Sequence, residues 1–258
     1  MILVLAGTLD GRDIAARLQT EGYDVIASVV SEYGRELAEQ SGVAVQAAPM
    51  NEEELARFVS VKGVRLIIDA THPFAVKVSR NAAHVAETAG IPCLRYERQS
   101  SQLPKYGRLY LADGMESAAQ LSTTLGKTIF LTTGSHTLSC FRKAAKGTDC
   151  RLIARVLPQP EIITSCMANG FSPADIVALQ GPFSQALNRA LFEEYKAEVM
   201  VTKDSGYVGG TDAKIAAAME LGLAIVLILR PPLLQKNVFW SYDELVGQIV
   251  LDYQKGCE

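Results

Sequence analysis

Short apolar runs alternate with amphipathic segments along almost the whole chain, and this alternation restricts the fold more than any other feature. Each apolar run has the length of a strand, and each amphipathic segment repeats its apolar residues at helical spacing. Strands that alternate with helices form mostly parallel sheets, so we expect an α/β fold. The expected strands are residues 2–5, 24–30, 42–46, 64–70, 91–96, 128–132, 152–156, 176–179, 199–202 and 224–229.

The chain of 258 residues divides at a change in composition. Gln, Ser and Pro cluster between positions 97 and 105, and the strand–helix alternation resumes beyond them. Polar segments of this kind are typical of links between domains, and the length suits two modest domains. We predict domains at residues 1–98 and 99–258, with similar architecture in the two halves.

The composition disfavours several classes of protein. The formal net charge is −3 and no block of basic residues occurs, which argues against nucleic acid as a partner. The apolar run at residues 224–229 is far shorter than the about 20 residues that a membrane-spanning helix needs. Five cysteines without a C-x-x-C pair indicate reduced thiols in a cytoplasmic protein. Three histidines without ligand spacing disfavour a structural zinc site, so we expect no metal.

One apolar strand ends abruptly in the polar turn Asp69-Ala70-Thr71-His72-Pro73. In an open α/β sheet, ligands bind beyond the carboxyl ends of the strands, so this turn is a candidate wall of a ligand site. Pro73 disfavours helical geometry at His72 and keeps the turn open before the next helix. The alternative is a local turn in which the side chains of Asp69 and Thr71 satisfy backbone donors.

The loop between the first strand and the first helix is a candidate phosphate site. Gly7, Thr8, Gly11 and Arg12 lie where a Rossmann fold binds a pyrophosphate. Glycines permit close approach there, and a helix N-terminus favours an anion. The spacing differs from the G-x-G-x-x-G fingerprint. The alternative is an ordinary turn that Thr8 or Asp10 caps.

The end of the second expected strand bears on the choice of dinucleotide. NAD-preferring sites usually place an acidic residue there to bind the ribose hydroxyls, and this strand has none. Ser28, Ser31 and Arg35 can instead bind a 2′-phosphate, because hydroxyls and a guanidinium satisfy a dianion. We therefore favour NADP over NAD. As alternatives, Ser31 caps the next helix and Arg35 lies on its solvated face.

Three polar loops follow expected strands in the second half, at residues 132–136, 180–184 and 203–210. Parallel strands share a direction, so we expect all three loops at one edge of the sheet. Together they suit an anionic polycarboxylate, although each alone is ordinary turn chemistry. His72 and His136 lie at strand ends and can move protons, with packing or hydrogen bonding as the alternative. The sequence has no nucleophile elbow and no Walker loop, which disfavours hydrolases and NTPases.

Several motifs follow one another in a distinctive order along nearly the whole chain. They are Gly7-Thr8-x-x-Gly11-Arg12, Ser31-x-Tyr33-Gly34, residues 69–75, Arg95-Tyr96-Glu97-Arg98, Thr133-Gly134-Ser135, residues 180–184, Lys203-Asp204-Ser205-Gly206 and Arg230-Pro231. In this order and spacing, the chain resembles the precorrin-6A reductase family of cobalamin biosynthesis, including its cobalt-precorrin-6A form. The family often has Glu at the position of Asp10, which keeps the charge, and Pro at that of Gln99.

The resemblance implies two Rossmann-like domains with the active site in the cleft between them. It implies NADPH on the N-terminal domain and hydride transfer to a macrocycle carbon of precorrin-6A, which gives precorrin-6B. The implied partner is a tetrapyrrole with many carboxylates, without nucleic acid or membrane, and with transient contacts to neighbouring pathway enzymes. The alternatives are another NADP-dependent reductase and a non-catalytic nucleotide- or tetrapyrrole-binding module.

The loops and the resemblance together give an expected role to individual positions. Lys203 and Asp204 are the expected catalytic residues, which we interpret as orienting and anion-pairing groups. The expected cofactor-binding residues are Gly7, Thr8, Gly11, Arg12, Ser28, Ser31, Tyr33, Arg35, Thr71, His72 and Pro73. The expected substrate-binding residues are Gly134, Ser135, His136, Gly181, Ser184, Lys203, Asp204, Ser205 and Gly206.

Overall fold

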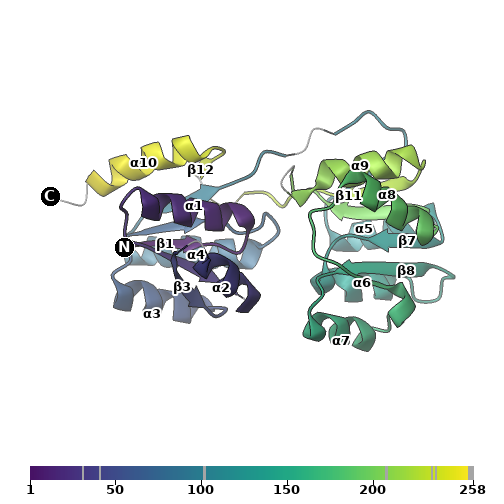
Figure 1. The fold of residues 1–258 in the computed structure, drawn as a ribbon, viewed down its shortest axis with the longest axis horizontal. Helices are drawn as coiled ribbons and strands as arrows, with labels where there is room; N and C mark the ends of the chain where they lie inside the picture. The colour runs from purple at the N-terminus through teal and green to yellow at the C-terminus, as the bar shows by residue number, and fades with distance from the viewer. Residues whose placement is uncertain are drawn as a thin grey trace. The chain divides into compact units, whose positions relative to one another are not determined.

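A computed structural model describes residues 1–30, 32–40, 42–100, 103–206, 209–233, 235 and 237–254. The chain forms two compact units (Figure 1). Unit 1 comprises Met1–Arg98 and Pro232–Glu258, and unit 2 comprises Gln99–Pro231. The assignment of residues 232–258 to the second domain was therefore wrong, because β12 and α10 of this segment join the sheet and the core of unit 1.

Unit 1 contains, within its described residues, one parallel sheet of six strands in the order β12-β5-β4-β1-β2-β3. Read from the other edge, this is the strand order of a Rossmann fold, with β12 in the sixth place. The winding of the chain reverses between β1 and β4, and ligands of such sheets bind at this reversal. The strands are β1 (Ile2–Leu5), β2 (Val25–Val29), β3 (Ala44–Ala47), β4 (Leu66–Asp69), β5 (Cys93–Tyr96) and β12 (Val238–Phe239).

Helices cover both faces of this sheet, as its apolar strands require. Successive strand residues point to opposite faces. Ile2 and Val4 therefore share a core with α1 and α10, whereas Leu3 and Leu5 share one with α3 and α4. The helices are α1 (Leu9–Thr20), α2 (Glu32–Glu39), α3 (Glu52–Lys62), α4 (Val76–Ala89) and α10 (Tyr242–Gln254).

The C-terminal segment is bound to unit 1 by backbone and side-chain contacts. The amide of Arg95 donates to the carbonyl of Asn237 (2.8 Å) where β12 pairs with β5. Leu245 of α10 is fully buried in the core beneath α1. Tyr242 donates its hydroxyl to Glu21 at the end of α1 (2.9 Å), and the two helices lie side by side in Figure 1. These contacts link segments that are far apart in the sequence.

Unit 2 contains a second parallel sheet, with six described strands in the order β6-β11-β10-β7-β8-β9. From β7 the chain winds outward through β8 and β9, and it then returns to β10 on the other side of β7. The reversal between β7 and β10 is therefore a second candidate ligand position. The strands are β6 (Leu109–Ala112), β7 (Thr128–Leu131), β8 (Arg151–Val156), β9 (Ile176–Ala178), β10 (Val199–Lys203) and β11 (Ala224–Ile228). The helices are α5 (Met115–Leu125), α6 (Leu138–Ala144), α7 (Pro160–Ala168), α8 (Gln185–Glu194) and α9 (Thr211–Glu220), with 3-10 turns η1 (Ser135–Thr137) and η2 (Pro173–Asp175).

The predicted α/β fold with parallel sheets is confirmed, since every strand pairing among the described residues is parallel. Each expected strand is present, with its ends shifted by a residue or two at most. The polar loops of the second half follow β7, β9 and β10, so they share one edge of the sheet as predicted. Strands β6 and β12 were not among the expected strands.

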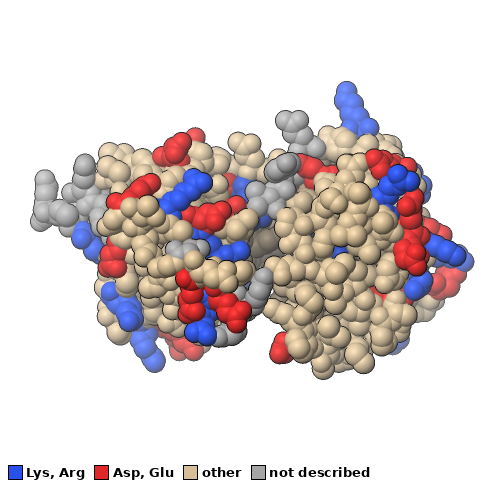
Figure 2. Space-filling view, viewed as in Figure 1, with Lys and Arg blue, Asp and Glu red and all other residues tan. Residues whose placement is uncertain are grey.

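The surface charges, the thiols and the helices also bear on the expectations from the sequence. Among the described residues on the face shown in Figure 2, Lys and Arg are intermixed with Asp and Glu. Cys93, Cys140, Cys150 and Cys166 are free thiols. No helix in the described ranges is long and apolar enough to cross a membrane.

Truncation of a buried residue of α10 will test whether this helix completes the core of unit 1. Leu245 is 0% exposed, whereas Leu251 on the same helix is 55% exposed. We expect Leu245→Ala to lower the free energy of unfolding by about 2–5 kcal/mol. The control Leu251→Ala should change it by less than about 0.5 kcal/mol. Urea unfolding followed by circular dichroism measures both, and equal effects would contradict the assignment.

Candidate functional site

The loops after β1 and β4 meet where the winding of the unit 1 sheet reverses. Thr8 Oγ1 donates to the carbonyl of Ala70 (2.9 Å) and accepts from the amide of Gly11 (3.1 Å). Thr8 therefore caps α1, which was one interpretation of this loop, and also joins the two loops. Asp10, the other candidate cap, lies in the first turn of α1 instead.

Gly7 and Gly11 serve different purposes in this loop. A Cβ on Gly11 would lie 2.7 Å from Ala6 Cα and 3.2 Å from Ala70 O, so glycine permits the close approach of α1 to β1. A Cβ on Gly7 would meet no atom within 4 Å, and Gly7 is exposed. The first amides of a helix have no carbonyl partner within it, so the open space at Gly7 can receive a phosphate. Arg12 follows in α1 and is half-buried.

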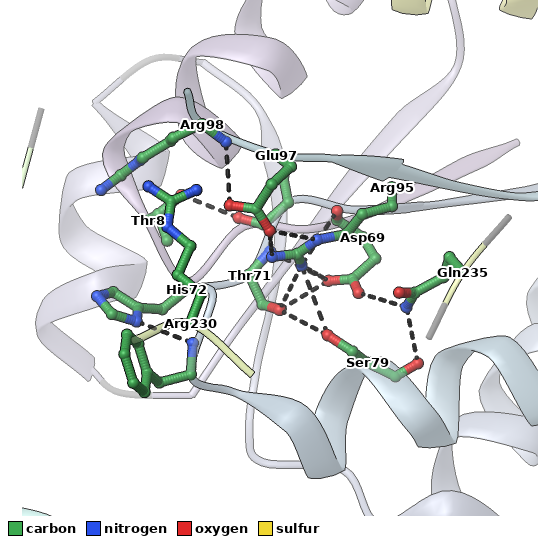
Figure 3. A network of polar contacts seen from close by, with 12 residues as sticks. Thr8, Asp69, Thr71, His72, Ser79, Arg95, Glu97, Arg98, Arg230 and Gln235 are labelled. Atoms are coloured by element: carbon green, nitrogen blue, oxygen red, sulfur yellow. Dashed lines mark hydrogen bonds and ion pairs between the residues drawn. The ribbon is translucent and has the colours of Figure 1, made fainter. Parts of the chain in front are cut away.

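A buried arginine holds two carboxylates behind these loops (Figure 3). Arg95 donates to Asp69 Oδ1 (2.8 Å) and to Glu97 Oε2 (2.7 Å), and none of the three side chains is more than 2% exposed. Asp69 Oδ1 also accepts from the hydroxyl (2.7 Å) and the amide (3.1 Å) of Thr71. The local-turn interpretation is thus confirmed for Asp69, which accepts from a backbone amide, whereas the Thr71 hydroxyl bonds to side chains instead. The same bonds fix the position of the turn after β4.

This arginine–carboxylate network reaches outward in two directions. Gln235 Nε2 donates to Asp69 Oδ2 (3.0 Å), which ties the C-terminal segment to β4. The amide of Arg98 donates to Glu97 Oε1 (3.1 Å), and the guanidinium of Arg98 pairs with Asp10 in the first turn of α1. Motifs that are separate in the sequence therefore form one cluster, which sequence reasoning did not find.

His72 and Pro73 are half-buried in the turn after β4. His72 Nδ1 accepts from the amide of Phe74 (3.3 Å), and the two rings lie 5.7 Å apart between centroids. A neutral imidazole that accepts at Nδ1 carries its proton at Nε2. This bond gives the imidazole a role in shaping the turn.

The residues predicted at the adenosine end lie on β2 and α2. Ser28 is buried near the end of β2. Arg35 pairs with Glu39 one turn further along α2, with 3.3 Å between Nη1 and Oε1. Ser31 and the side chain of Tyr33 lie outside the described residues. Their predicted contact with a cofactor stays a prediction.

In unit 2, the turn after β10 is organised by its own side chains. The amide of Gly206 donates to Asp204 Oδ1 (3.3 Å), and the amide of Ser205 donates to Thr211 Oγ1 (3.2 Å). Gly206 has φ 71°, in the left-handed region that favours glycine. Arg230 Nε lies 3.3 Å from Asp204 Oδ2 and donates to the Asp204 carbonyl (3.0 Å). Asp204 is buried, so these contacts make it an orienting group.

Other predicted substrate residues lie around the reversal between β7 and β10. Lys203 ends β10 and is half-buried, and burial lowers the pKa of its ammonium. Gly134 and Ser135 follow β7 and are half-buried, while His136 is exposed in η1. The structure thus brings polar groups from two adjacent strands to one position on the sheet edge.

The loop after β9 adjoins the loop after β10. A Cβ on Gly210 would lie 3.4 Å from Pro182 Cβ. Ser184 Oγ accepts from the amide of Leu187 (3.2 Å), so Ser184 caps α8. Gly181 is exposed beside Pro182. The close approach of Gly210 to Pro182 brings the predicted polar loop at residues 180–184 to the loop that follows Lys203.

Sequence reasoning missed two buried cations that border the same edge. Arg155 lies near the end of β8, and Lys214 lies in α9. A charged residue within the apolar run of β8 was the available signal for Arg155. Lys214 gave no signal, because a lysine in an amphipathic helix usually lies on its solvated face.

Comparison with known proteins identifies the family. A sequence model described as "Precorrin-6x reductase CbiJ/CobK" matches residues 1–249. The chain belongs to this family. The cobalt-precorrin-6A reductase of Priestia megaterium is 40% identical over 97% of this chain and 98% of its own length. The precorrin-6A reductase of Rhodococcus erythropolis is 33% identical over 96% and 95%, respectively.

A solved structure shows the same fold. CobK precorrin-6A reductase superposes with a TM-score of 0.81 at 24% sequence identity, over 97% of this chain and 96% of that chain. The two parallel sheets described above are thus shared with a solved member of the precorrin-6x reductase family.

Removal of the buried arginine will leave two carboxylates of unit 1 uncompensated. We expect Arg95→Met to lower the free energy of unfolding by about 3–5 kcal/mol, because it leaves buried carboxylates without their charged partner. The control is Arg80→Met, which changes an exposed arginine of α4 and should shift it by less than about 0.5 kcal/mol. Chemical unfolding of both variants provides the measurement. An Arg95→Met loss no larger than that of the control would show that the arginine–carboxylate network does not stabilise unit 1.

Proposed function

We propose that this protein catalyses the NADPH-dependent reduction of a ring double bond in precorrin-6A or cobalt-precorrin-6A, giving the corresponding precorrin-6B. The observation that carries the proposal is the exposed Gly7 at the N-terminus of α1, at the reversal of the unit 1 sheet, in a chain of a reductase family. We place the reaction in the cytoplasm. Unit 1 binds the dinucleotide and unit 2 binds the tetrapyrrole.

The residues of unit 1 fit a phosphorylated dinucleotide. The loop at Gly7 and the first amides of α1 can bind the pyrophosphate. Strand β2 ends in Ala27-Ser28-Val29, without the acidic residue that would repel a 2′-phosphate. Arg35 supplies a guanidinium on the helix that follows. When bound, the reduced nicotinamide would supply a hydride to one atom of the ring double bond, and a proton taken up from solvent would complete the reduction at the other.

The chain itself contributes position and charge. The arginine–carboxylate network and His72 hold the turn after β4, and a fixed turn favours the near-attack geometry that hydride transfer requires. In unit 2, Lys203 at the end of β10 binds a carboxylate of the tetrapyrrole. Lys203 and Asp204 are the proposed catalytic pair, in which Asp204 orients the turn and Lys203 pairs with an anionic group of the substrate.

The test adds NADPH and NADH separately to the purified protein, followed by precorrin-6A or its cobalt form. Tighter binding of NADPH, and its oxidation only when the tetrapyrrole is present, would support the proposal. NADPH binding without oxidation would favour a binding module. A protein that binds neither dinucleotide would contradict the proposed function.

Two glycine variants separate cofactor binding from folding. Gly7→Ala adds a methyl group into open space, so we expect unchanged stability and about a tenfold or greater loss of NADPH affinity. Gly11→Ala places the same methyl group against Ala6 and Ala70, so we expect a loss of about 1–3 kcal/mol in the free energy of unfolding. Fluorescence titration and urea unfolding measure the two effects. Normal NADPH affinity in Gly7→Ala would argue against a phosphate at this loop.

A histidine variant tests the role of the turn after β4. His72→Ala removes one hydrogen bond that shapes the turn, so we expect NADPH affinity to fall about two- to tenfold, with a smaller change in kcat. The control His84→Ala changes an exposed histidine of α4 that pairs with Glu52. Steady-state kinetics with both substrates distinguish the cases. A large loss of kcat at unchanged NADPH affinity would assign His72 to the chemical step instead.

A further inference from the structure

Two buried cations of unit 2 have no carboxylate partner among the described residues. Arg155 is 9% exposed and Lys214 is 8% exposed. Within the described part of the chain, the ion pairs of unit 2 involve other residues, and neither of these two cations takes part. Burial of an uncompensated charge is costly, so natural proteins usually pair such groups or use them at functional sites.

The contacts that hold the two side chains are neutral. Arg155 Nη1 donates to Asn188 Oδ1 (2.7 Å), and the guanidinium carbon lies 4.8 Å from the centroid of the Phe183 ring. Lys214 Nζ donates to the carbonyl of Gly209 (3.2 Å). Each contact fixes a side chain without neutralising its charge. For Arg155, this one hydrogen bond leaves most of its five N–H donors unused by the described residues.

The surroundings of Lys214 increase the electrostatic cost. Arg155 on β8 and Lys203 on β10 are the charged groups that act on it. Burial, together with these two cations, lowers the pKa of Lys214 to about 7. Burial also lowers the pKa of Arg155 to about 10. Asp212, the acidic residue in the first turn of α9, forms no ion pair with Lys214 among the residues described.

The position of the cations on the sheet points to a ligand. Arg155 is the last residue but one of β8, Lys203 is the last of β10, and Lys214 follows the loop after β10. All three therefore lie at the carboxyl edge, where parallel sheets bind ligands. The loop with Phe183 and the loop with Gly209 adjoin there, since Gly210 lies against Pro182. The cations and both loops thus border one position.

We propose that Arg155 and Lys214 together bind one acetate or propionate carboxylate of the tetrapyrrole. This deepens the proposed function and rests on it. The planar guanidinium matches the two oxygens of a carboxylate, and the ammonium adds a point charge from a second element. Binding compensates charges that the described residues leave without a carboxylate, so the carboxylate is bound more tightly here than at an exposed lysine.

The test uses cobyrinic acid, a stable corrin polycarboxylate, as the probe. We expect Arg155→Met and Lys214→Met each to weaken its binding about tenfold to a hundredfold, because each loses a charge-assisted contact. Urea unfolding of both variants is measured as well, because Arg155→Met leaves Asn188 Oδ1 without this donor, and the affinities are compared where each variant is fully folded. The control Lys146→Met changes an exposed lysine of the same unit and should leave the affinity unaltered.

Proton uptake on binding provides a second measurement. A merely structural role of Lys214 would produce no such uptake. One pH unit above the pKa of about 7, most Lys214 side chains are neutral, and a bound carboxylate will draw a proton from the buffer onto Nζ. Calorimetry in two buffers of different ionisation enthalpy measures this uptake. We expect it in the wild type and in Arg155→Met, and not in Lys214→Met.

The outcomes separate this proposal from the proposed function. Failure of the wild-type protein to bind cobyrinic acid, or unchanged affinity in both variants, would overturn the carboxylate site. Displacement of cobyrinic acid by an equal concentration of inorganic phosphate would overturn it in favour of a phosphate site. NADPH affinity is measured in every variant. If the wild-type protein did not bind NADPH, this would contradict the dinucleotide role of unit 1 and leave the carboxylate site of unit 2 unaffected.

Discussion

The ion pair between Arg95 and Asp69 is the interaction on which the functional end of unit 1 depends. The two residues are register partners on neighbouring strands, so the sheet itself brings their charges together in the interior. A buried arginine is tolerated there because Glu97 and Thr71 complete its hydrogen bonding. Hydrogen bonds connect this one guanidinium to three segments: the loop before α1, the turn after β4 and the C-terminal segment.

The two units treat buried charge in opposite ways. In unit 1 the central cation has carboxylates on both sides, and the cluster is complete without a ligand. In unit 2, Arg155 and Lys214 have neutral hydrogen-bond partners among the described residues, which leaves their charge for a bound anion to compensate. The first arrangement gives rigidity to a loop, whereas the second gives selectivity for an anion. Buried charges thus have different roles in two units of similar fold.

The sequence predicts the sheets well because burial imposes a local pattern. Each buried strand is a short apolar run, and the parallel direction then places the polar loops at one edge. It does not predict the pairing of β12 with β5, since residues far apart in the chain leave no local periodicity. It also does not predict that Arg95, Arg155 and Lys214 are buried, because a single charged residue is expected to be solvated unless its partners in space are known. The roles of Asp69 and Thr71 remained open for the same reason.

The order of the segments has a consequence for how the chain matures. The polypeptide leaves unit 1 at residue 98 and returns to it at residue 232, so unit 2 is inserted within unit 1. During synthesis, the described strands of unit 2 emerge before β12 and α10 of unit 1. Domains generally fold as units while the chain grows. The inner unit is therefore able to fold first, and Asp69 receives its hydrogen bond from Gln235 only after unit 2 has been synthesised.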